Sequence, residues 1–331
     1  MADQTLDVVG IGNAIVDVIA HSTDAFLQEQ ELAKGGMMLI DADRATELYG
    51  LMEPALEMSG GSAANTIAGI ASFGGKAGFI GKVRNDQLGD VFAHDIRALG
   101  VTYGTPSATE GAPTARCLIL VTPDAQRTMN TFLGACQALG PDDVDPYLIE
   151  SAQITYLEGY LWDPEMAKAA FRKAMDIAHA ANRKVALTLS DAFCVDRYRE
   201  EFRELVKNQV DILFANESEI TSLYETKDFD EALQQVRQDC DFAALTRSEK
   251  GSVVFSNDEI HVIDAQPGVK VVDSTGAGDM YAAGFLYGLT NGKSLHDCGR
   301  LGGLAAAEVI SHVGARPETS YKDLMKAKLG L

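Results

Sequence analysis

The sequence predicts an α/β protein with a mostly parallel central sheet, helices on both faces of that sheet, and a small β-sheet lid. Short apolar runs rich in β-formers alternate with helix-length stretches over most of the 331 residues, an order typical of parallel sheets covered by helices. Two stretches, 13–41 and 101–132, contain strand-like runs without a helix after each one. The composition, 46 % hydrophobic and 23 % charged, is that of a globular protein.

The elements of the predicted core follow one another along the chain. Gly292 separates the last two of its helices. The core is expected to comprise 1–12, 42–100 and 133–331. Its strands are expected at Leu6–Ile11, Lys76–Ile80, Ile154–Leu157, Lys184–Leu189, Asp211–Phe214 and Phe242–Leu245, and its main helices at 164–182, 196–208, 228–239, 279–290 and 294–311.

The predicted lid consists of the two insertions 13–41 and 101–132. A separately folded domain is normally one contiguous segment, whereas a small sheet made from two insertions suggests a lid over a site. We expect this sheet to be antiparallel. Its strand-like runs are Ala14–Ala20, Met37–Ile40, Arg116–Val121 and Arg127–Phe132.

Charge and cysteine content exclude several classes of protein. Lys and Arg total 28 against 48 Asp and Glu, a net charge of −20, and such a surface repels nucleic-acid backbones and anionic lipids. The five cysteines are scattered and form no CxxC pair, which favours a reducing cytosol over a disulfide scaffold or a zinc site. No signal peptide or membrane-length apolar stretch is evident. We expect a cytoplasmic protein that binds neither nucleic acid nor membranes.

The most informative motif is Val271-Val-Asp-Ser-Thr-Gly-Ala-Gly-Asp279, where a β-branched run leads into small residues and then into a helix. Unpaired N–H groups at a helix N-terminus can hold an anion, and Gly276 and Gly278 allow a phosphate to approach the backbone closely. A carboxylate beside an anion site suits a base that accepts a hydroxyl proton. Asp279 is therefore a candidate base, although a tight turn capped by Asp279 explains this segment equally well.

A second glycine-rich motif is Ser59-Gly-Gly-Ser-Ala-Ala-Asn65. Gly60 and Gly61 permit close approach of a ligand at the start of a helix, and Asn65 can both donate to and accept from a diol. In isolation, a closely packed helix behind a glycine turn is the favoured interpretation.

Asn13 and Asp17 follow the first predicted strand. On an extended chain Asn13, Ile15 and Asp17 share one face. An amide, an apolar side chain and a carboxylate on one face suit a molecule with vicinal hydroxyls and a flat apolar part. The polar edge of a solvated strand accounts for the same pattern equally well.

Asn216-Glu-Ser-Glu219 follows the strand predicted at Asp211–Phe214. A polar pair at this place can hold Mg²⁺ through water, because Mg²⁺ keeps several waters and needs few direct protein ligands. The stronger interpretation of the local pattern is a variant of the capping box at the start of a helix. The two interpretations are compatible.

Taken in this order, the motifs resemble those of the ribokinase-like (PfkB) family of sugar and nucleoside kinases. Gly60–Asn65 with Gly74, Gly75 and Gly81 resembles the N-terminal signature of that family. Asp273–Asp279 resembles its C-terminal signature, and Asn216–Glu219 is similar to its magnesium motif. The resemblance extends over roughly 6–317 and implies a ribokinase-like three-layer core with a small β-sheet lid. Within the family, three segments are similar to adenosine kinases: 10–17, 187–193 and 210–219.

The resemblance implies phosphoryl transfer from ATP to the 5′-hydroxyl of adenosine, giving AMP. Asp279 would be the general base, and the backbone N–H groups of Gly276, Ala277 and Gly278 would form the anion hole. Arg127 resembles a lid arginine that reaches toward the phosphates, a task that suits its planar donor fork. The substrate would be bound by Asn13, Asp17, Gly60, Gly61, Ser62, Asn65, Leu133, Ala135 and Tyr160.

The family resemblance also implies the ATP and cation sites. Mg²⁺ would be held through water near Asn216 and Glu219, and family members often bind K⁺ near the anion hole. Many members carry Thr-x-Gly-x-x-Gly beside the nucleotide, whereas this chain has Ser248 in place of the first glycine. The ATP contacts expected from the resemblance are Asn216, Thr246, Ser248, Gly251, Gly276 and Gly278.

Two alternatives to adenosine phosphorylation stay open. One is a kinase for another nucleoside or a free sugar, such as inosine, guanosine, ribose or fructose. The other is a non-catalytic nucleoside-binding regulator on the same scaffold, which would have no need of Asp279. In each case the expected partners are small molecules, and the protein is a monomer or a homodimer.

Overall fold

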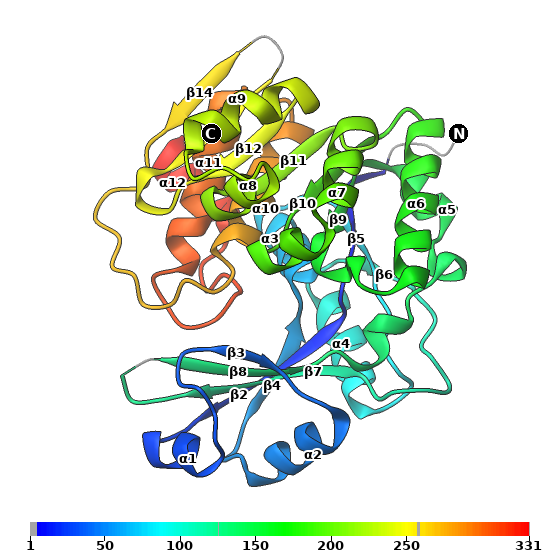
Figure 1. Ribbon diagram of the computed structural model, residues 1–331, viewed down its shortest axis with the longest axis vertical. Helices are drawn as coiled ribbons and strands as arrows, with labels where there is room; N and C mark the ends of the chain where they lie inside the picture. The colour runs from blue at the N-terminus through cyan, green and yellow to red at the C-terminus, as the bar shows by residue number, and fades with distance from the viewer. Residues whose placement is uncertain (1–4, 125, 257–258, 331) are drawn as a thin grey trace.

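The computed structural model describes residues 5–124, 126–256 and 259–330, which form two sheets of very different size (Figure 1). The large sheet has nine strands in the order β14-β13-β12-β11-β10-β9-β1-β5-β6, and the small sheet has five in the order β3-β8-β7-β2-β4. The α/β class and the mostly parallel central sheet are confirmed. No helix in the described part of the chain is long and apolar enough to cross a membrane.

The large sheet is parallel except at one edge. Six of its strands are those predicted from the sequence, with bounds that differ by up to two residues. The parallel strands are β1 (Leu6–Ile11), β5 (Ala77–Ile80), β6 (Thr102–Tyr103), β9 (Ala152–Glu158), β10 (Lys184–Thr188), β11 (Ile212–Asn216) and β12 (Ala243–Thr246), and the antiparallel pair at the edge is β13 (Ser252–Phe255) and β14 (Ile260–Ile263).

Helices cover both faces of the large sheet, as Figure 1 shows. One face packs against α5 (Pro146–Ser151), α6 (Glu165–Ala180), α7 (Ala192–Asn208), α8 (Glu217–Leu223) and α9 (Phe229–Asp239). The other packs against α3 (Ser62–Phe73), α4 (Gln87–Ala98), α10 (Ala277–Thr290) and α11 (Leu295–Val309), with α12 (Tyr321–Leu329) outside them.

Alternation along the strands explains the two apolar layers. Successive residues of a strand point to opposite faces, so in β11 Leu213 joins the core under α6–α9 while Phe214 joins the core under α10. There the ring of Phe214 meets Phe285 edge to face, with centroids 5.5 Å apart. Strands buried on both faces carry continuous apolar runs, which is why they were recognisable in the sequence.

The small sheet consists of β2 (Ile15–His21), β3 (Met37–Leu39), β4 (Leu56–Gly60), β7 (Ala115–Val121) and β8 (Arg127–Phe132). Helices α1 (Asp24–Glu29) and α2 (Ala42–Leu51) cover the face turned away from the core (Figure 1). Leu27 and Leu48 of these helices pack with Val16, Val18, Leu118 and Leu120 of the sheet.

The small sheet is mixed, so the expectation of an antiparallel sheet is wrong for two of its pairings. Strands β7 and β8 are antiparallel, as expected for neighbours joined by a short turn, and β2 and β4 are antiparallel too. However, β2 and β7 are parallel, as are β3 and β8. The long stretches of chain between the members of these pairs allow a parallel crossover.

The strands also depart from the predicted lid boundaries at two places. Strand β4 lies in 42–100, the segment assigned to the core, but pairs with β2 of the small sheet. Strand β6 lies in 101–132 but pairs with β5 of the large sheet. Both strands are short, and neither has a local pattern that identifies its pairing partner.

Candidate active site

A cavity of about 1430 Å³ lies between the large sheet and the small sheet. Loops at the carboxyl ends of the parallel strands form its floor, the usual place for ligands in open α/β sheets. The small sheet supplies an apolar wall. Floor residues include Asn13, Glu158, Ser190, Asn216 and Thr246, and wall residues include Ile15, Met37, Leu39, Cys117, Ile119 and Met129.

The glycine turn before α10 opens into this cavity. Gly276 is the N-cap, with φ of 77°, and a Cβ there would lie 2.8 Å from the Cα of Ala315. The N–H of Ala277, which was predicted to belong to the anion hole, instead donates to Ser274 O (3.2 Å). The N–H groups of Gly278, also predicted, and of Asp279, not predicted, have no partner in the described structure. A Cβ on Gly278 would meet no atom within 4 Å. The free donors therefore face space that an anion can occupy.

Asp279 is held by the second glycine-rich motif. Ser62 Oγ donates to one carboxylate oxygen (2.6 Å) and Asn65 Nδ2 donates to the other (3.1 Å). Burial raises the pKa of Asp279 to about 6, while these two hydrogen bonds and the charge of Arg316 lower it. The carboxylate is thus ionised at neutral pH, and its pKa is closer to neutrality than that of an exposed Asp, as a general base requires.

Asp17, on β2, is a second mostly buried carboxylate. Gly60 leaves it room, since a Cβ at that position would lie 2.5 Å from the Asp17 carboxyl carbon. Burial raises the pKa of Asp17 to about 6, Arg127 and Arg316 lower it, and Asp279 raises it. Asp17 accepts no hydrogen bond from the residues that the structure describes, so its oxygens are available to a ligand.

Glu158, the last residue of β9, was missed by sequence reasoning. It accepts hydrogen bonds from Asn13 Nδ2 (2.6 Å), Asn13 N (3.3 Å) and Ala63 N (2.8 Å). Burial raises its pKa to about 7. A glutamate at the carboxyl end of a mostly buried strand was a usable signal, because such a residue lies at the sheet edge where ligands bind.

Asn216 and Glu219 form the predicted capping box at the start of α8. Asn216 Oδ1 accepts from Glu219 N (2.9 Å), and Glu219 accepts from Asn216 N (2.9 Å) and Nδ2 (2.6 Å). The capping interpretation is confirmed. Both residues also line the cavity, and burial raises the pKa of Glu219 to about 7.

A hydrated Mg²⁺ fits this pair better than a directly ligated ion. Within the described ranges no three His, Cys, Asp or Glu side chains gather as a metal-binding group. Glu219 is 5 % exposed and forms no ion pair with any residue that the structure describes, so its charge is poorly compensated by the protein itself. A cation that keeps its own waters would compensate that charge without displacing the cap.

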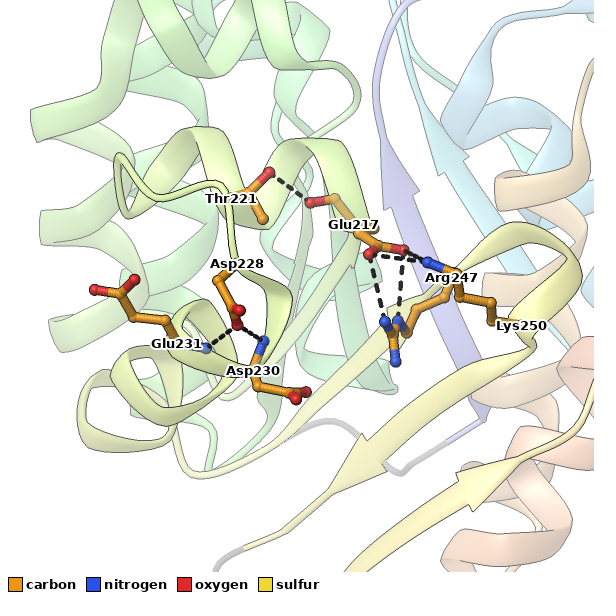
Figure 2. A network of polar contacts seen from close by, with 7 residues as sticks. All are labelled: Glu217, Thr221, Asp228, Asp230, Glu231, Arg247 and Lys250. Carbon is orange, nitrogen blue, oxygen red and sulfur yellow. Dashed lines mark hydrogen bonds and ion pairs between the residues drawn. The ribbon is translucent and has the colours of Figure 1, made fainter.

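Hydrogen bonds connect the turn at 246–251 to α8, as Figure 2 shows. Glu217 accepts from Arg247 Nη2 (3.4 Å) and from Lys250 Nζ (3.4 Å). The Arg247 guanidinium also lies over the Phe229 ring, 3.9 Å from its centroid. In the same view Asp228 caps α9 by accepting from Asp230 N and Glu231 N. These contacts fix the turn beside the Asn216–Glu219 pair.

Ser248 and Gly251 both have positive φ within that turn. Gly251 has φ of 79° and ψ of −128°, and a Cβ there would lie 1.9 Å from Ile263 O, so only glycine fits. Ser248 has φ of 51°, which lies in the left-handed region. This conformation is unfavourable for any residue with a Cβ atom. This explains physically why a glycine is common at the position of Ser248. Thr246, Ser248 and Gly251 all line the cavity.

Arg127, at the start of β8, forms a buried ion pair with Asp273 at 2.5 Å. Asp273 also accepts from Thr275 N, Thr275 Oγ1 and Gly314 N. The structure thus places Arg127 at the base of the glycine turn, where it connects the small sheet to the core. It does not itself line the cavity.

The predicted base pocket is partly assembled. Leu133 and Tyr160 line the cavity, whereas Ala135 is buried behind it. Phe193, in the first turn of α7, also lines the cavity and is 81 % exposed. Sequence reasoning missed Phe193, although an aromatic residue just after the predicted strand 184–189 was a usable signal. It also missed Arg316, for which no local motif exists.

The comparison with known families decides the identity of this fold. A family profile described as pfkB family carbohydrate kinase matches residues 29–321. The chain belongs to the PfkB family. This family assignment and the predicted resemblance agree.

Solved and curated PfkB relatives are similar over nearly the whole chain. The structure of an adenosine kinase from Sinorhizobium meliloti has 54 % sequence identity, covers 98 % of this chain and 99 % of its own, and superposes with a TM-score of 0.90. A probable sugar kinase from Rhizobium etli CFN 42 has 52 % identity, the same coverages and a TM-score of 0.91. The adenosine kinase of Saccharomyces cerevisiae is 25 % identical over 332 residues, covering 94 % of this chain and 96 % of its own. The PfkB protein described here is accordingly a nucleoside or sugar kinase with a ribokinase-like fold.

Proposed function

We propose that this PfkB kinase transfers the γ-phosphoryl group of ATP to the 5′-hydroxyl of adenosine, giving AMP and ADP. The observation that carries the proposal is the position of Asp279. This carboxylate lies beside the free N–H groups of the α10 turn and accepts hydrogen bonds from Ser62 and Asn65 of the second glycine-rich motif. An acceptor alcohol held there would have a base on one side and an anion site on the other.

The reaction needs three contributions from the chain. Asp279 accepts the proton of the 5′-hydroxyl while the 5′-oxygen forms a bond to the γ-phosphorus of ATP. The bond between the γ-phosphorus and the β-γ bridging oxygen breaks in the same step, and ADP leaves. The N–H groups of Gly278 and Asp279 stabilise negative charge on the transferred group, because they are oriented before the reaction begins. The wall formed by the small sheet excludes water, whose attack would waste ATP.

Asp17, Gly61 and Asn65 are the proposed ribose-binding residues. The unpaired carboxylate of Asp17 suits two vicinal hydroxyls. Gly61 has φ of 99° and a Cβ there would lie 2.1 Å from Asn13 O, so the turn brings the backbone close to this site. Asn13 and Ser62 lie beside the same space, since both line the cavity.

Asn216 and Glu219 are the residues proposed to hold a hydrated Mg²⁺, which when bound would neutralise charge on the β- and γ-phosphates. Thr246, Ser248 and Gly251 are proposed to contact ATP, since their turn lies next to that pair. Arg127 is proposed to strengthen the anion site from beneath, through Asp273.

Adenosine is favoured over a free sugar by the apolar side of the cavity. Tyr160 and Phe193 present aromatic surface to it, and Leu133 adds an aliphatic contact. A purine base stacks on such surfaces, whereas a free sugar needs polar partners on all sides. The 54 % identity to the S. meliloti adenosine kinase supports the same choice.

The test is a panel of acceptors with ATP and Mg²⁺: adenosine, inosine, guanosine, ribose and fructose. ADP release and chromatography of the product measure the transfer, in K⁺ and in Na⁺ buffers. We expect kcat/KM to be at least about tenfold higher for adenosine, the discrimination that a few lost contacts produce. Preference for ribose or fructose would assign a sugar kinase. Turnover with none of them would favour a regulator.

A further inference from the structure

We propose that Arg316 is a positioning residue that orients Asn65, and through Asn65 the carboxylate of Asp279, while anchoring both to strand β4 of the small sheet. The proposal rests on the proposed function, in which Asp279 is the base. Arg316 follows α11 and does not line the cavity, so it acts on the reaction only through its neighbours.

The hydrogen bonds of Arg316 determine which way the Asn65 amide faces. Arg316 Nε donates to Asn65 Oδ1 at 2.7 Å. With its oxygen engaged in this way, the amide presents Nδ2 to Asp279, and that bond is 3.1 Å long. An amide turned by 180° would place its oxygen against the carboxylate, which is repulsive. Arg316 therefore selects the productive orientation.

A second arm of Arg316 reaches the small sheet. Its Nη2 donates to Ser59 O (2.8 Å) and to Ser59 Oγ (3.1 Å). Ser59, the fourth residue of β4, is in turn bound to Asp95 of α4 through its N–H (2.8 Å). One guanidinium thus connects the base to the strand that carries Gly60, the neighbour of Asp17.

The charge of Arg316 has a role that a neutral donor could not fill. The side chain is mostly buried and forms no salt bridge with any residue of the described structure. No direct ion pair therefore offsets the free-energy cost of removing its charge from water. Burial lowers the pKa of Arg316, and the charges of Asp95, Asp17 and Asp279 raise it. The cation is thus stabilised by the carboxylates of the site, and it stabilises their ionised forms in return.

The charged groups that the structure describes around Asp279 are acidic except for Arg316. Asp17 on β2, Glu158 at the end of β9 and Glu219 on α8 are acidic groups whose pKa values Asp279 raises. Ser62 and Asn65 are neutral donors. Arg316 is the cation that lowers the pKa of Asp279. Its removal should raise that pKa above about 6 and leave less ionised base near neutral pH.

The variants Arg316→Met, Arg316→Gln and Arg316→Lys separate geometry from charge. For Arg316→Met we expect the acid limb of the kcat profile to move up by about one pH unit, the usual effect of losing one nearby opposite charge. We expect kcat at the optimum to fall about tenfold or more, since an error of about 1 Å in position can cost up to about a hundredfold. KM for ATP should not change. Arg316→Lys should keep the acid limb near that of the wild type and lose only part of kcat, whereas Arg316→Gln should shift the limb.

Arg97→Met is the matched control. Arg97 also donates to a backbone carbonyl, Tyr103 O (3.0 Å), and lies over the Tyr103 ring, but it is not among the groups that shift the pKa of Asp279. Arg97 is exposed, so Arg97→Met should cost no more stability than Arg316→Met, and its pH profile should stay that of the wild type.

A direct titration does not depend on turnover. In protein labelled with ¹³C at the aspartate carboxylates, Asp279→Asn identifies the signal of Asp279. Its midpoint should be higher in Arg316→Met than in the wild type. Equal midpoints and equal acid limbs would overturn the inference about Arg316. A shifted midpoint in a protein that phosphorylates no acceptor would instead overturn the proposed function and leave the coupling of Arg316 to Asp279 standing.

Discussion

Asp279 and Asp17 are both mostly buried carboxylates with a pKa of about 6, but their neighbours differ. Asp279 accepts hydrogen bonds from Ser62 and Asn65, which hold it in one orientation beside the free N–H groups of α10. No residue in the described structure donates a hydrogen bond to the carboxylate of Asp17. The held carboxylate suits proton transfer, which needs fixed geometry, and the unpaired one suits binding of hydroxyl groups.

Replacing Asp279 with Asn tests this division at a single residue. Asparagine keeps the shape and removes the base, so kcat should fall by roughly two to four powers of ten, the usual cost of losing a general base. Adenosine should bind nearly as well as before, measured by calorimetry, because the binding residues are unchanged. Near-normal turnover of the variant would remove Asp279 from the role of base.

Ser248→Gly should make the protein slightly more stable. The left-handed conformation at φ of 51° costs a residue with a side chain about 1–2 kcal/mol, and the greater freedom of glycine in the unfolded chain cancels about 0.4–1 kcal/mol of the gain. We expect a net increase of about 0.5 kcal/mol in urea unfolding.

Glu249→Gly is the control for Ser248→Gly. Glu249 lies in the same turn without a positive φ, so glycine there brings only the entropic cost and should destabilise the protein. If both variants lost stability equally, Ser248 would not be strained.

Among the elements, the junction between the small sheet and α10 depends on contacts made by few side chains. Arg127 from β8 reaches Asp273 below the glycine turn, and Arg316 reaches Ser59 on β4. Both arginines join the sheet that forms the cavity wall to the segments that hold Asp279. Movement of the small sheet would therefore shift Asp279 and the anion site together.

Asp273→Asn should destabilise the protein by about 3 kcal/mol or more, because it leaves Arg127 as a buried and unpaired cation. The free energy of unfolding in urea measures the loss. Glu47→Gln, which breaks the exposed pair of Arg44 and Glu47, is the control and should cost less than about 1 kcal/mol. A loss for Asp273→Asn as small as that of the control would show that the buried pair does not hold the junction.

At the scale of the whole molecule, four carboxylates with raised pKa values line one cavity in a protein of net charge −20. Burial raises the pKa of Asp17 and Asp279 to about 6 and that of Glu158 and Glu219 to about 7. Ionising all four without a ligand is unfavourable. A cation or a hydroxyl donor placed in the cavity would favour the ionised forms of these carboxylates.

The stability of the empty protein should consequently fall as the pH rises from about 4.5 to 7. In that window the folded state binds protons more tightly than the unfolded state, so raising the pH removes stability. The carboxylates with lowered pKa values, such as Asp273 and Asp297, lose their contribution only below about pH 4, near the ordinary value for Asp.

Thermal unfolding without ligands should therefore show a higher Tm at pH 5.5 than at pH 7.5, and the free energy of unfolding should be higher at pH 5.5 by a total on the order of a few kcal/mol. Glu219→Gln, which can retain the capping contacts, should reduce the difference. A Tm that rises over this range, or an unchanged profile in Glu219→Gln, would contradict the raised pKa values.

The parts of the fold and site that the sequence predicts are those made by contiguous residues. The parallel strands are continuous apolar runs, the Asn216–Glu219 cap spans four residues, and the glycine turn of α10 lies directly before its helix. Each depends on backbone geometry and hydrogen bonds within a short segment, so the residues in order suffice to predict it. Sequence order thus located Asp279 and the anion turn.

Tertiary structure alone decided the pairing in the small sheet and the neighbours of the acidic groups. Glu158 meets Asn13 across 145 positions, and Arg316 meets Asn65 across 251. The same folding brings Phe193 to the cavity and makes β2 and β7 parallel. Such contacts depend on how separate elements pack against one another. Packing determines the burial of each acidic group and the charges beside it, and these set its pKa and orientation. No local pattern in the sequence encodes this packing.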